Sequence, residues 1–381
     1  MEALLIPLFA GALVFLASLI SLRLGLSVAI IEILLGVFAG NYFGFQAEPW
    51  MTYLAGFGGI MLTFLAGAEI DLPLMKSRLK ESLLIGGASF FLPFIGTFAF
   101  TYYVLSWQLN AALIAGAALS TTSLAVVYSV LVETGLTKTN LGKSIMAATF
   151  ITDIGTALAL SILFLKPTLY TLEFAVVSIV VVWFAAKYSG RIFNNKKYKN
   201  KVIEPEIKYI FILLLILVYF AAIGDSHAVL PAFFLGLFMS PYFAGHSDTK
   251  VVMSRLRTVA YALITPFFFI VAGLKVSLPL VIGALGLFVA LFAIKQITKF
   301  IGVYFLAKKY LPKGEIYTTL LMSTGLTFGT IASVFGYQAG YITQVQFSVL
   351  IAVVIASAVI PTFIAQKWFK PVHSEDTING D

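Results

Sequence analysis

Ionisable residues lie inside long apolar segments, where a charge is costly and therefore marks function. Asp153 is the clearest case, midway along the apolar segment 141–165 and within the stretch FITDIGTALAL. Thr149, Thr152 and Thr156 surround it, and Thr149 lies one helical turn before it. Such a carboxyl group either stays protonated and hydrogen-bonds inside a helix bundle, or exchanges its proton for a small cation. We predict the second, with Asp153, Thr149 and Thr152 as ion-binding residues.

Two lysines form a second unusual feature, in the apolar segment 278–306. Lys295 and Lys299 are one helical turn apart in AIKQITKFIG and share a face of the predicted helix. Lys295 is nearer the centre of the segment, whereas Lys299 is displaced toward one end and could snorkel to the membrane surface. We expect at least one of them to face the protein interior, near a carboxylate or a backbone carbonyl. Both lysines are therefore candidate site residues, for a direct or a supporting role beside Asp153.

Hydroxyl-rich stretches interrupt two further apolar segments, Ser120–Ser123 in segment 110–134 and STGLTFGT in segment 315–338. Either these hydroxyls bond back to carbonyls of an intact helix, or the helix breaks and offers oxygen ligands and half-helix ends to a cation. The two segments are seven apart in order and so run in opposite directions, as expected of inverted repeats with two broken crossing helices. We predict breaks. The further ligands of a bound cation would be Thr121, Thr122 and Ser123, with Thr324 and Thr327 in support.

Composition places these residues in a membrane protein. Of 381 residues, 60% are hydrophobic and 11% are charged, against roughly 25% charged in a soluble domain. The apolar residues fall in segments long enough to cross a bilayer as helices and too long for barrel strands, so we predict an all-α polytopic membrane protein. We expect thirteen transmembrane helices, at 3–22, 26–45, 51–70, 82–106, 110–134, 141–165, 169–189, 207–224, 228–244, 258–275, 278–306, 315–338 and 345–367.

Other classes of protein are disfavoured by what the chain contains. It has no cysteine and three scattered histidines, so we expect no metal cluster and no cofactor. The net charge of +8 could indicate a nucleic-acid partner, but the basic residues sit in short loops between spans, so we expect none. The sequence shows no nucleophile–base pair, which disfavours an enzyme. It also shows no repeated filter motif such as TVGYG, which disfavours a cation channel.

The basic loops predict the orientation in the cytoplasmic membrane. Lys76, Arg78 and Lys80 follow the third span and the Lys196–Lys201 run follows the seventh, whereas the opposite loops carry little besides Lys166 and Lys275. We therefore expect a multi-pass protein with its N-terminus outside and its C-terminus in the cytoplasm. The first segment could be mistaken for a signal peptide, but Glu2 replaces the basic residues of such a peptide, which favours a true span.

Two glutamates complete the set of supporting candidates. Glu32 lies within the second span and is either functional or paired with a basic loop residue. Glu69 ends the third span in AEIDLPLMK, which reads mainly as a helix end at the cytoplasmic interface.

Together the motifs resemble the monovalent cation:proton antiporters of the second subfamily, which contains NapA-type Na+/H+ exchangers and Kef-type K+ efflux systems. The similarity runs from about residue 5 to 367. It is carried by IEILLGVFAG (31–40), LTFLAGAEIDL (62–72), STTSLAVVYSVLVETG (120–135), ITDIGT (151–156) and KFIGVYFLAKK (299–309). The first subfamily carries a Glu in its third helix, where this chain has Leu65, which favours the second.

The resemblance implies roles for particular residues. The ion-binding aspartate of the family corresponds to Asp153, and its core lysine to Lys299 through the K-x-x-G spacing to Gly302. Lys295 has no obvious counterpart. Familiar members carry Asn, Asp or Gln before the aspartate, where this chain has Thr152. The missing second carboxylate favours electroneutral, one-for-one exchange. The nucleotide-binding domain of Kef systems has no counterpart after Lys370, so gating by such ligands is not expected.

The resemblance also implies a division of the chain. Helices 1–3 (1–75) and 8–10 (207–277) would form a dimerisation domain, and helices 4–6 (76–166) and 11–13 (278–370) a core domain that moves against it. Residues 167–206 would hold a linker helix and a basic cytoplasmic loop, and 371–381 a short tail. We expect a homodimeric Na+/H+ antiporter working by alternating access. The alternatives are a Kef-type K+/H+ antiporter without its regulatory domain and a Na+-coupled organic solute symporter.

Overall fold

The computed structural model describes residues 2–25, 27–70, 73, 79–137, 139–163, 169–193, 203–224, 226–244 and 247–371. Regular structure in this part of the chain is helical throughout, and ten of its helices are long and apolar enough to cross a membrane. Three shorter apolar helices accompany them, Val28–Phe43, Leu109–Ser120 and Val229–Phe243. The predicted all-α membrane class is thus confirmed. Most of the predicted basic loop within 167–206 and most of the tail 371–381 lie outside the described residues, as do Lys76, Arg78 and Lys166.

Contacts between Cα atoms divide the chain into two compact units. Unit 1 comprises 1–47, 77–156 and 269–381, and unit 2 comprises 48–76 and 157–268. This division groups residues that pack together, whereas the predicted core and dimerisation domains describe parts that move. The predicted domain boundaries therefore stay predictions.

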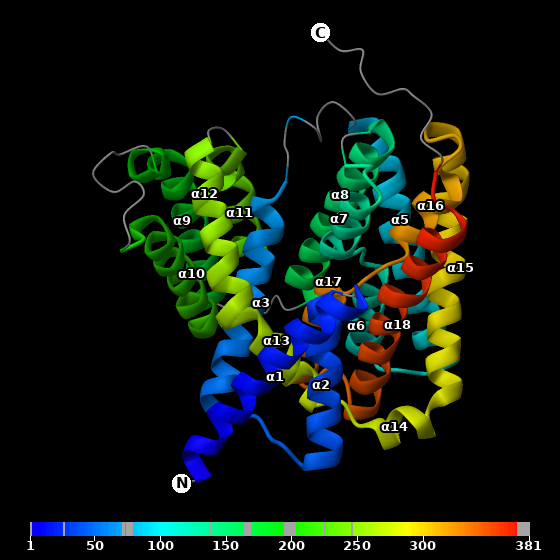
Figure 1. The fold of residues 1–381 in the computed structure, drawn as a ribbon, viewed down its shortest axis with the longest axis horizontal. Coiled ribbons are helices and arrows are strands. Elements are labelled where there is room, and N and C mark those ends of the chain that lie inside the picture. Colours follow the sequence, from blue (N-terminus) through cyan, green and yellow to red (C-terminus); the bar gives the residue numbers. More distant parts are fainter. Residues whose placement is uncertain are drawn as a thin grey trace. The chain divides into compact units, whose positions relative to one another are not determined.

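Unit 1 is built mainly from helices that follow the predicted spans (Figure 1). Its elements are α1 (Glu2–Leu24), α2 (Val28–Phe43), α5 (Leu79–Ala99) with a π-helical extension (Phe100–Val104), α6 (Leu109–Ser120), α7 (Leu124–Glu133), most of α8 (Asn140–Leu163), the end of α13 (Thr265–Leu274), α14 (Leu278–Gly283), α15 (Leu285–Tyr310), α16 (Glu315–Met322), α17 (Thr327–Gln338) and α18 (Gln344–Trp368).

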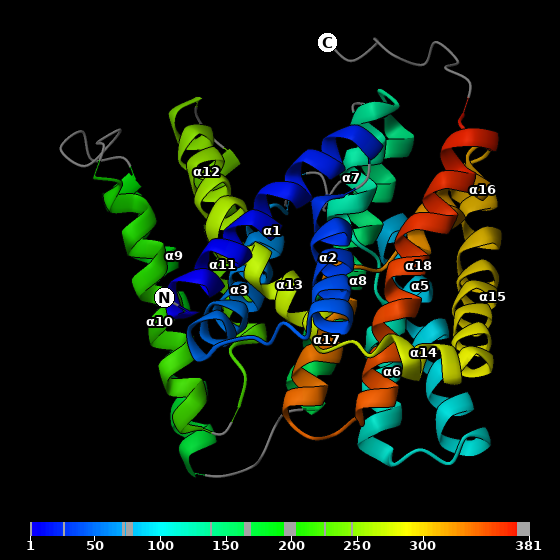
Figure 2. The same ribbon diagram turned by 60° about the horizontal axis from the view of Figure 1, so that its bottom comes forward.

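Small residues let the helices of unit 1 approach closely. A Cβ added to Gly302 of α15 would lie 2.8 Å from the carbonyl oxygen of Ala88 in α5, and one added to Gly155 of α8 would lie 3.0 Å from the ring of Phe90. Such small residues are typical of membrane helix interfaces, because van der Waals packing replaces the hydrophobic effect there. Figures 1 and 2 both show α5 running beside α15. Since α5 lies against both α8 and α15, it holds Asp153 and the two lysines in one bundle.

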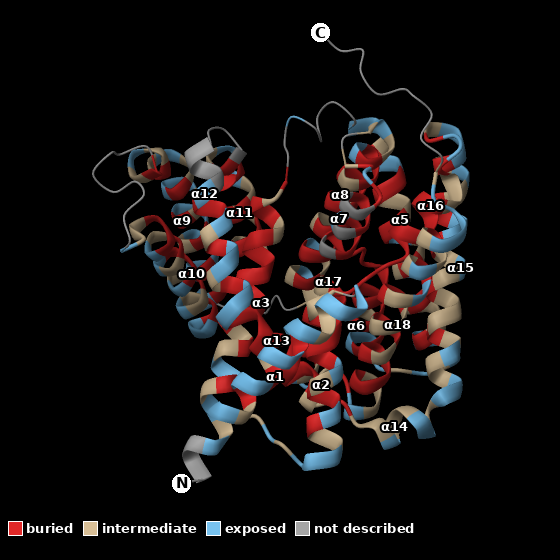
Figure 3. Ribbon diagram, in the orientation of Figure 1, coloured by how far each residue is buried: buried red, intermediate tan, exposed pale blue. Residues whose placement is uncertain are grey.

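Burial differs strongly between these helices. In the apolar window of Glu315–Gln338, which contains α16 and α17, 94% of the residues are buried, against 17% in that of the first helix. Nine consecutive residues of α17, Phe328–Gly336, are buried, whereas Figure 3 shows exposed residues along much of α1. The second interrupted segment thus lies in the interior of unit 1, where polar groups must find partners within the protein.

Unit 2 contains α3 (Pro49–Ala68), α9 (Leu169–Phe193), α10 (Pro205–Ile223), α11 (Val229–Ala244), α12 (Ser247–Val259), a π-helical turn (Ala260–Ile264) and the start of α13. α3 and α11 meet through Gly67 and Gly236, each of which packs on the other helix's backbone. Two ion pairs tie α12 to its neighbours, Arg255 to Glu204 at 2.9 Å and Arg257 to Glu69 at 2.9 Å.

Two helices differ from the predicted spans. The tenth span was expected at 258–275, but the helix begins at Ser247 and continues through the π-helical turn to Leu274. Hydropathy marks only the part of a helix that crosses hydrocarbon, so the charged first turns of α12 were missed. The eleventh span was expected to be continuous over 278–306, but α14 ends at Gly283 before α15 begins at Leu285.

Candidate functional site

The two predicted interruptions are present. α6 ends at Ser120 and α7 begins at Leu124, which leaves Thr121–Ser123 in extended or irregular backbone. α16 ends at Met322 and α17 begins at Thr327, which leaves Ser323–Leu326 outside regular helix. Each break frees backbone groups inside the membrane, and such groups are tolerated only where the protein or a polar cavity satisfies them.

The two breaks satisfy each other. The backbone N–H of Ser123 donates to the carbonyl oxygen of Thr324 at 3.2 Å. The hydroxyl of Thr122 donates to the carbonyl oxygen of Met322 at 2.9 Å, and the hydroxyls of Ser123 and Thr327 lie 3.5 Å apart. Segments about two hundred positions apart in the sequence therefore cross at their unwound parts. The crossing brings together Thr122, Ser123, Thr324 and Thr327, four of the predicted site residues.

Lys299 closes the crossing from α15. Its ammonium donates to the hydroxyl of Ser89 on α5 at 2.8 Å, to the carbonyl oxygen of Ser120 at 2.8 Å and to the hydroxyl of Thr122 at 3.1 Å. Ser120 is the last residue of α6, so the positive charge lies at the negative end of a half-helix dipole. The expectation that one lysine faces the interior near a backbone carbonyl is confirmed, and Lys299 does not snorkel.

Lys295 is also fully buried, but its surroundings differ. Its ammonium lies beside the second break, since a Cβ added to Gly325 would be 2.5 Å from the Lys295 nitrogen and 2.7 Å from the hydroxyl oxygen of Thr121. No hydrogen-bond acceptor for it occurs among the described residues. The two lysines, one turn apart on α15, therefore sit on the two breaks in unequal environments.

Asp153 lies on α8, which packs against the same crossing. Its side chain is buried, with 2% exposure, and it interacts electrostatically with Lys299. The hydroxyl of Thr149, one turn earlier, approaches the sulfur of Met322 at 3.6 Å, which ties this face of α8 to the second break. The predicted carboxylate thus faces the protein interior, close to the buried lysine and the interrupted helices.

The threonines around Asp153 use their protons within their own helix. The hydroxyl of Thr149 donates to the carbonyl oxygen of Ile145 at 2.9 Å, that of Thr152 to Thr149 at 2.7 Å, and that of Thr156 to Thr152 at 2.9 Å. A hydroxyl that donates in this way keeps oxygen lone pairs free to face a cation. The bonds therefore orient these oxygens without removing their capacity as ligands.

The two supporting glutamates belong to different units. Glu32 is buried in α2 of unit 1, with 2% exposure. Glu69 belongs to unit 2, where its carboxylate accepts a hydrogen bond from Arg257 at 3.0 Å and forms an ion pair with it. Burial raises the pKa of Glu69, and Arg257 opposes the rise. Glu69 is thus held at a helix end, as the sequence suggested.

Sequence reasoning missed one partner in this site. Ser89 of α5 accepts from Lys299, and its only signal was a hydroxyl within the apolar run GGASFFLPF. Ser120 was noted as part of the hydroxyl cluster, but the contact uses its backbone carbonyl, which any residue would supply. The assembled site is one buried carboxylate, two buried lysines and a crossing of two unwound segments rich in oxygen atoms. It could hold a small cation by oxygen ligands, and it could hold a proton on the carboxylate.

Comparisons with known proteins agree with this architecture. A family model described as "Sodium/hydrogen exchanger, transmembrane" matches residues 11–370. The chain is similar to a "Probable Na(+)/H(+) antiporter 3" of Methanocaldococcus jannaschii, at 26% identity over 357 residues, covering 90% of this chain and 89% of that protein. It is similar to a "Na(+)/H(+) antiporter" of Enterococcus hirae, at 26% identity, covering 93% of this chain and 95% of that protein. The solved structure of the sodium proton antiporter MjNhaP1 of M. jannaschii superposes with a TM-score of 0.72 at 16% identity, covering 97% of this chain and 100% of that one, which shows a shared fold.

Proposed function

Since the chain belongs to the sodium/hydrogen exchanger family, we propose that this multi-pass membrane protein is a secondary transporter exchanging Na+ for H+, with both ions competing for Asp153. The observation that supports this most is the carboxyl group of Asp153, which is buried on α8 beside the crossing of two interrupted helices. A nearby cation favours the ionised carboxylate and so expels its proton, while a proton removes the charge that binds the cation. One site then serves both ions in turn.

The cation would be held by oxygen atoms from three elements. Asp153 supplies the charge, Thr152 and Thr149 present oxygens from α8, and the break between α6 and α7 supplies those of Thr121, Thr122 and Ser123. Thr122 already donates to Met322 and accepts from Lys299, which leaves one lone pair of its oxygen for the ion. Thr324 and Thr327 belong to the second break and keep the crossing in place.

Lys299 would fix the geometry of this site rather than bind the cation. Its three hydrogen bonds link α15, α5 and the end of α6. When neither ion is bound, its charge lies near the ionised Asp153 and offsets part of the cost of a lone buried carboxylate. The cost that remains keeps the empty carrier from crossing readily, which enforces exchange instead of leak.

Transport further requires that the site open to each side in turn. We propose that residues 76–166 and 278–370 move as a core against a dimerisation domain of 1–75 and 207–277 in a homodimer, with 167–206 as linker and 371–381 as tail. The thirteen spans and the outward N-terminus in the cytoplasmic membrane belong to the same proposal. With one acidic carrier, exchange would be electroneutral, one Na+ for one H+.

A pH-dye assay in sealed proteoliposomes tests the function. Addition of Na+ should drive proton movement in the wild type, and Asp153→Asn should abolish it while leaving folding intact, because the amide keeps the shape but cannot ionise. The matched control is Glu173→Gln, an exposed carboxylate on α9, which should transport normally. Proton movement that survives in Asp153→Asn would remove the central residue from the proposal.

The same vesicles separate the alternatives. A response to K+ that equals or exceeds the response to Na+ would favour a K+/H+ antiporter, since cation selectivity depends on cavity size and ligand field. Na+ uptake that needs an organic solute and moves no proton would favour a symporter. A net current accompanying Na+-driven proton movement would contradict one-for-one exchange.

A further inference from the structure

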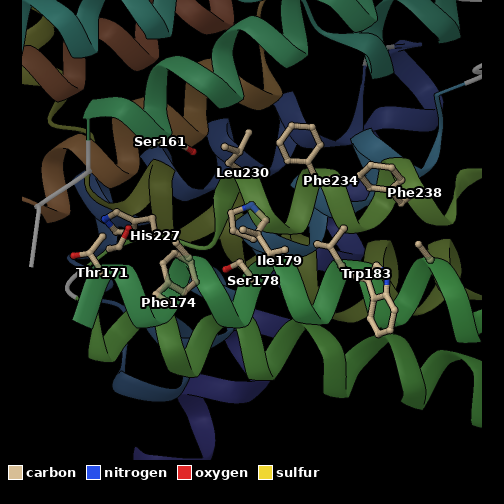
Figure 4. A pocket seen from close by; sticks show the side chains of 15 residues that line it. Ser161, Thr171, Phe174, Ser178, Ile179, Trp183, His227, Leu230, Phe234 and Phe238 are labelled. Atoms are coloured by element: carbon tan, nitrogen blue, oxygen red, sulfur yellow. The ribbon is translucent and has the colours of Figure 1, made fainter. Parts of the chain in front are cut away.

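A long apolar groove lies within unit 2, between α9 and α11, with a volume of about 620 Å³ (Figure 4). One stripe of α9 forms its floor and one rim, through residues that recur every three or four positions. The stripe comprises Thr171, Phe174, Ala175, Ser178, Ile179, Val182, Trp183 and Ala186. The opposite wall comes mainly from α11, with Leu230, Phe234 and Phe238 pointing toward the groove in Figure 4.

The shape of the groove suits a chain rather than a compact molecule. From Thr171 to Ala186 it follows α9 for about 22 Å, at about 1.5 Å per residue. That length exceeds the hydrocarbon of one leaflet, which is about half of the ~30 Å bilayer core. Small side chains at Ala175, Ser178 and Ala186 create the hollow, and large apolar ones line it. An extended hydrocarbon chain has the length and the polarity of this space.

Two serine hydroxyls in the groove have no hydrogen-bond partner among the described residues. Ser178 lies in its floor with 7% exposure, and its hydroxyl has no hydrogen-bond partner among the described residues. The hydroxyl of Ser161, which reaches the groove from α8, likewise has no partner there. A serine at a tight contact between membrane helices usually bonds across the contact. The two hydroxyls therefore mark a space between the helices and not a sealed contact.

Two cations stand at one end of the groove. The Lys187 nitrogen lies 4.6 Å from the ring centre of Trp183, which itself lines the groove, and the Arg191 guanidinium lies 4.9 Å from the ring of Tyr188. Neither cation has an ion-pair partner in the described part of the chain. Tryptophan, tyrosine and basic residues gather where a membrane meets water, so this end lies at the level of lipid headgroups.

We propose that the groove holds one acyl chain of an anionic membrane phospholipid, whose phosphate group contacts Lys187 and Arg191. The stripe of α9 supplies apolar contact along the chain, and the two cations supply the preference for a net negative headgroup. A zwitterionic lipid would occupy the same groove more weakly, because its ammonium group opposes the two cations. Occupancy of this site can be measured by binding alone, without an assay of ion transport.

Native mass spectrometry of the full-length protein in detergent tests this, with phosphatidylglycerol and phosphatidylcholine of the same chain length as probes. The wild type should retain phosphatidylglycerol at several-fold higher occupancy. Ala175→Leu and Ser178→Phe place bulk in the groove and should remove most of the retained lipid. Lys187→Gln with Arg191→Gln should make the two lipids equal. The control Val180→Phe adds the same ring to an exposed position of α9 outside the groove lining and should bind as the wild type does.

Several results would overturn the proposal. Unchanged retention in Ala175→Leu, whose position is exposed and tolerates bulk, would show that the chain does not lie in the groove even if Ser178→Phe fails to fold. Unchanged preference for phosphatidylglycerol in the double glutamine variant would exclude the headgroup contact. A shift from dimer to monomer in Ala175→Leu, without lipid present, would assign the groove to an interface between two copies of the chain.

Discussion

The two buried lysines of α15 allow a sharp test of the site, because they differ in partners and in little else. Both are fully buried and one turn apart, and each can be replaced by Met, which is close in length and apolar. Lys299→Met removes the donor to Ser89, Ser120 and Thr122. Lys295→Met removes no hydrogen bond to any described residue.

The expected free energies of unfolding follow from these contacts. A hydrogen bond from a charged group contributes about 1.5–3 kcal/mol, and three to one ammonium are not additive. Removing one partner from a buried charged cluster costs about 3–5 kcal/mol. We expect a loss in that range for Lys299→Met. For Lys295→Met we expect no loss, or a gain, because a buried ammonium without a protein acceptor is itself costly.

Thermal unfolding in detergent, followed by fluorescence-detected size exclusion, gives the comparison directly. The melting temperatures should rank Lys295→Met at or above the wild type and Lys299→Met clearly below it. Lys299→Arg controls for charge, since it keeps the cation but misplaces the donors, and should fall between. Equal loss in the two Met variants would show that the unequal hydrogen bonding of the two lysines is wrong, and with it the view that Lys299 braces the crossing.

Four further predictions follow from named contacts. Gly325→Ala should abolish transport, because its Cβ would lie 2.5 Å from the Lys295 nitrogen and 2.8 Å from the Thr121 carbonyl oxygen. Gly56→Ala is the control, since a Cβ at Gly56 would meet open space. Transport by Gly325→Ala would refute the close approach. The apparent KM for Na+ should rise about tenfold for each unit by which the pH falls in the acidic range, since protons compete with Na+ at one carboxyl group. A KM that does not change with pH would contradict this competition. Thr122→Val should weaken Na+ binding, and it should lower stability by about 1–3 kcal/mol because the Met322 carbonyl loses its donor. Unchanged Na+ affinity of this variant in a calorimetric titration would exclude Thr122 as a ligand. Burial raises the pKa of Glu69 and Arg257 lowers it, so Arg257→Gln should raise the Glu69 pKa further. The variant should therefore lose stability relative to the wild type as the pH rises and Glu69 ionises. A difference in melting temperature between the two proteins that shrinks as the pH rises would contradict this prediction.

The sequence was most informative where a polar residue broke an apolar pattern. The hydroxyl run Ser120–Ser123 and the stretch from Ser323 to Thr330 predicted two interruptions, and both helices break there. Asp153 and at least one of Lys295 and Lys299 were predicted to face the interior for the same reason, and all three are buried. An ionisable group exposed to lipid is so costly that one found within a span almost always faces the protein interior.

The sequence said least about contacts between distant segments. It could not show that Lys299 reaches Ser89, or that Lys295 lies against Gly325, because each contact depends on how α15 packs on helices far away in the chain. It also did not show the hydrogen bonds of the threonines around Asp153. Thr149 and Thr152 donate to carbonyls three or four residues earlier, which is the usual behaviour of threonine within a helix.

The central claim is that Na+ displaces a proton from Asp153, and proton release on Na+ binding measures it most directly. Purified protein in weakly buffered detergent solution, titrated with NaCl against choline chloride, should release about one proton per Na+ bound, because one carboxyl group exchanges one ion for the other. Asp153→Asn should release none, and Glu173→Gln should release as much as the wild type. Undiminished proton release from Asp153→Asn would contradict the account.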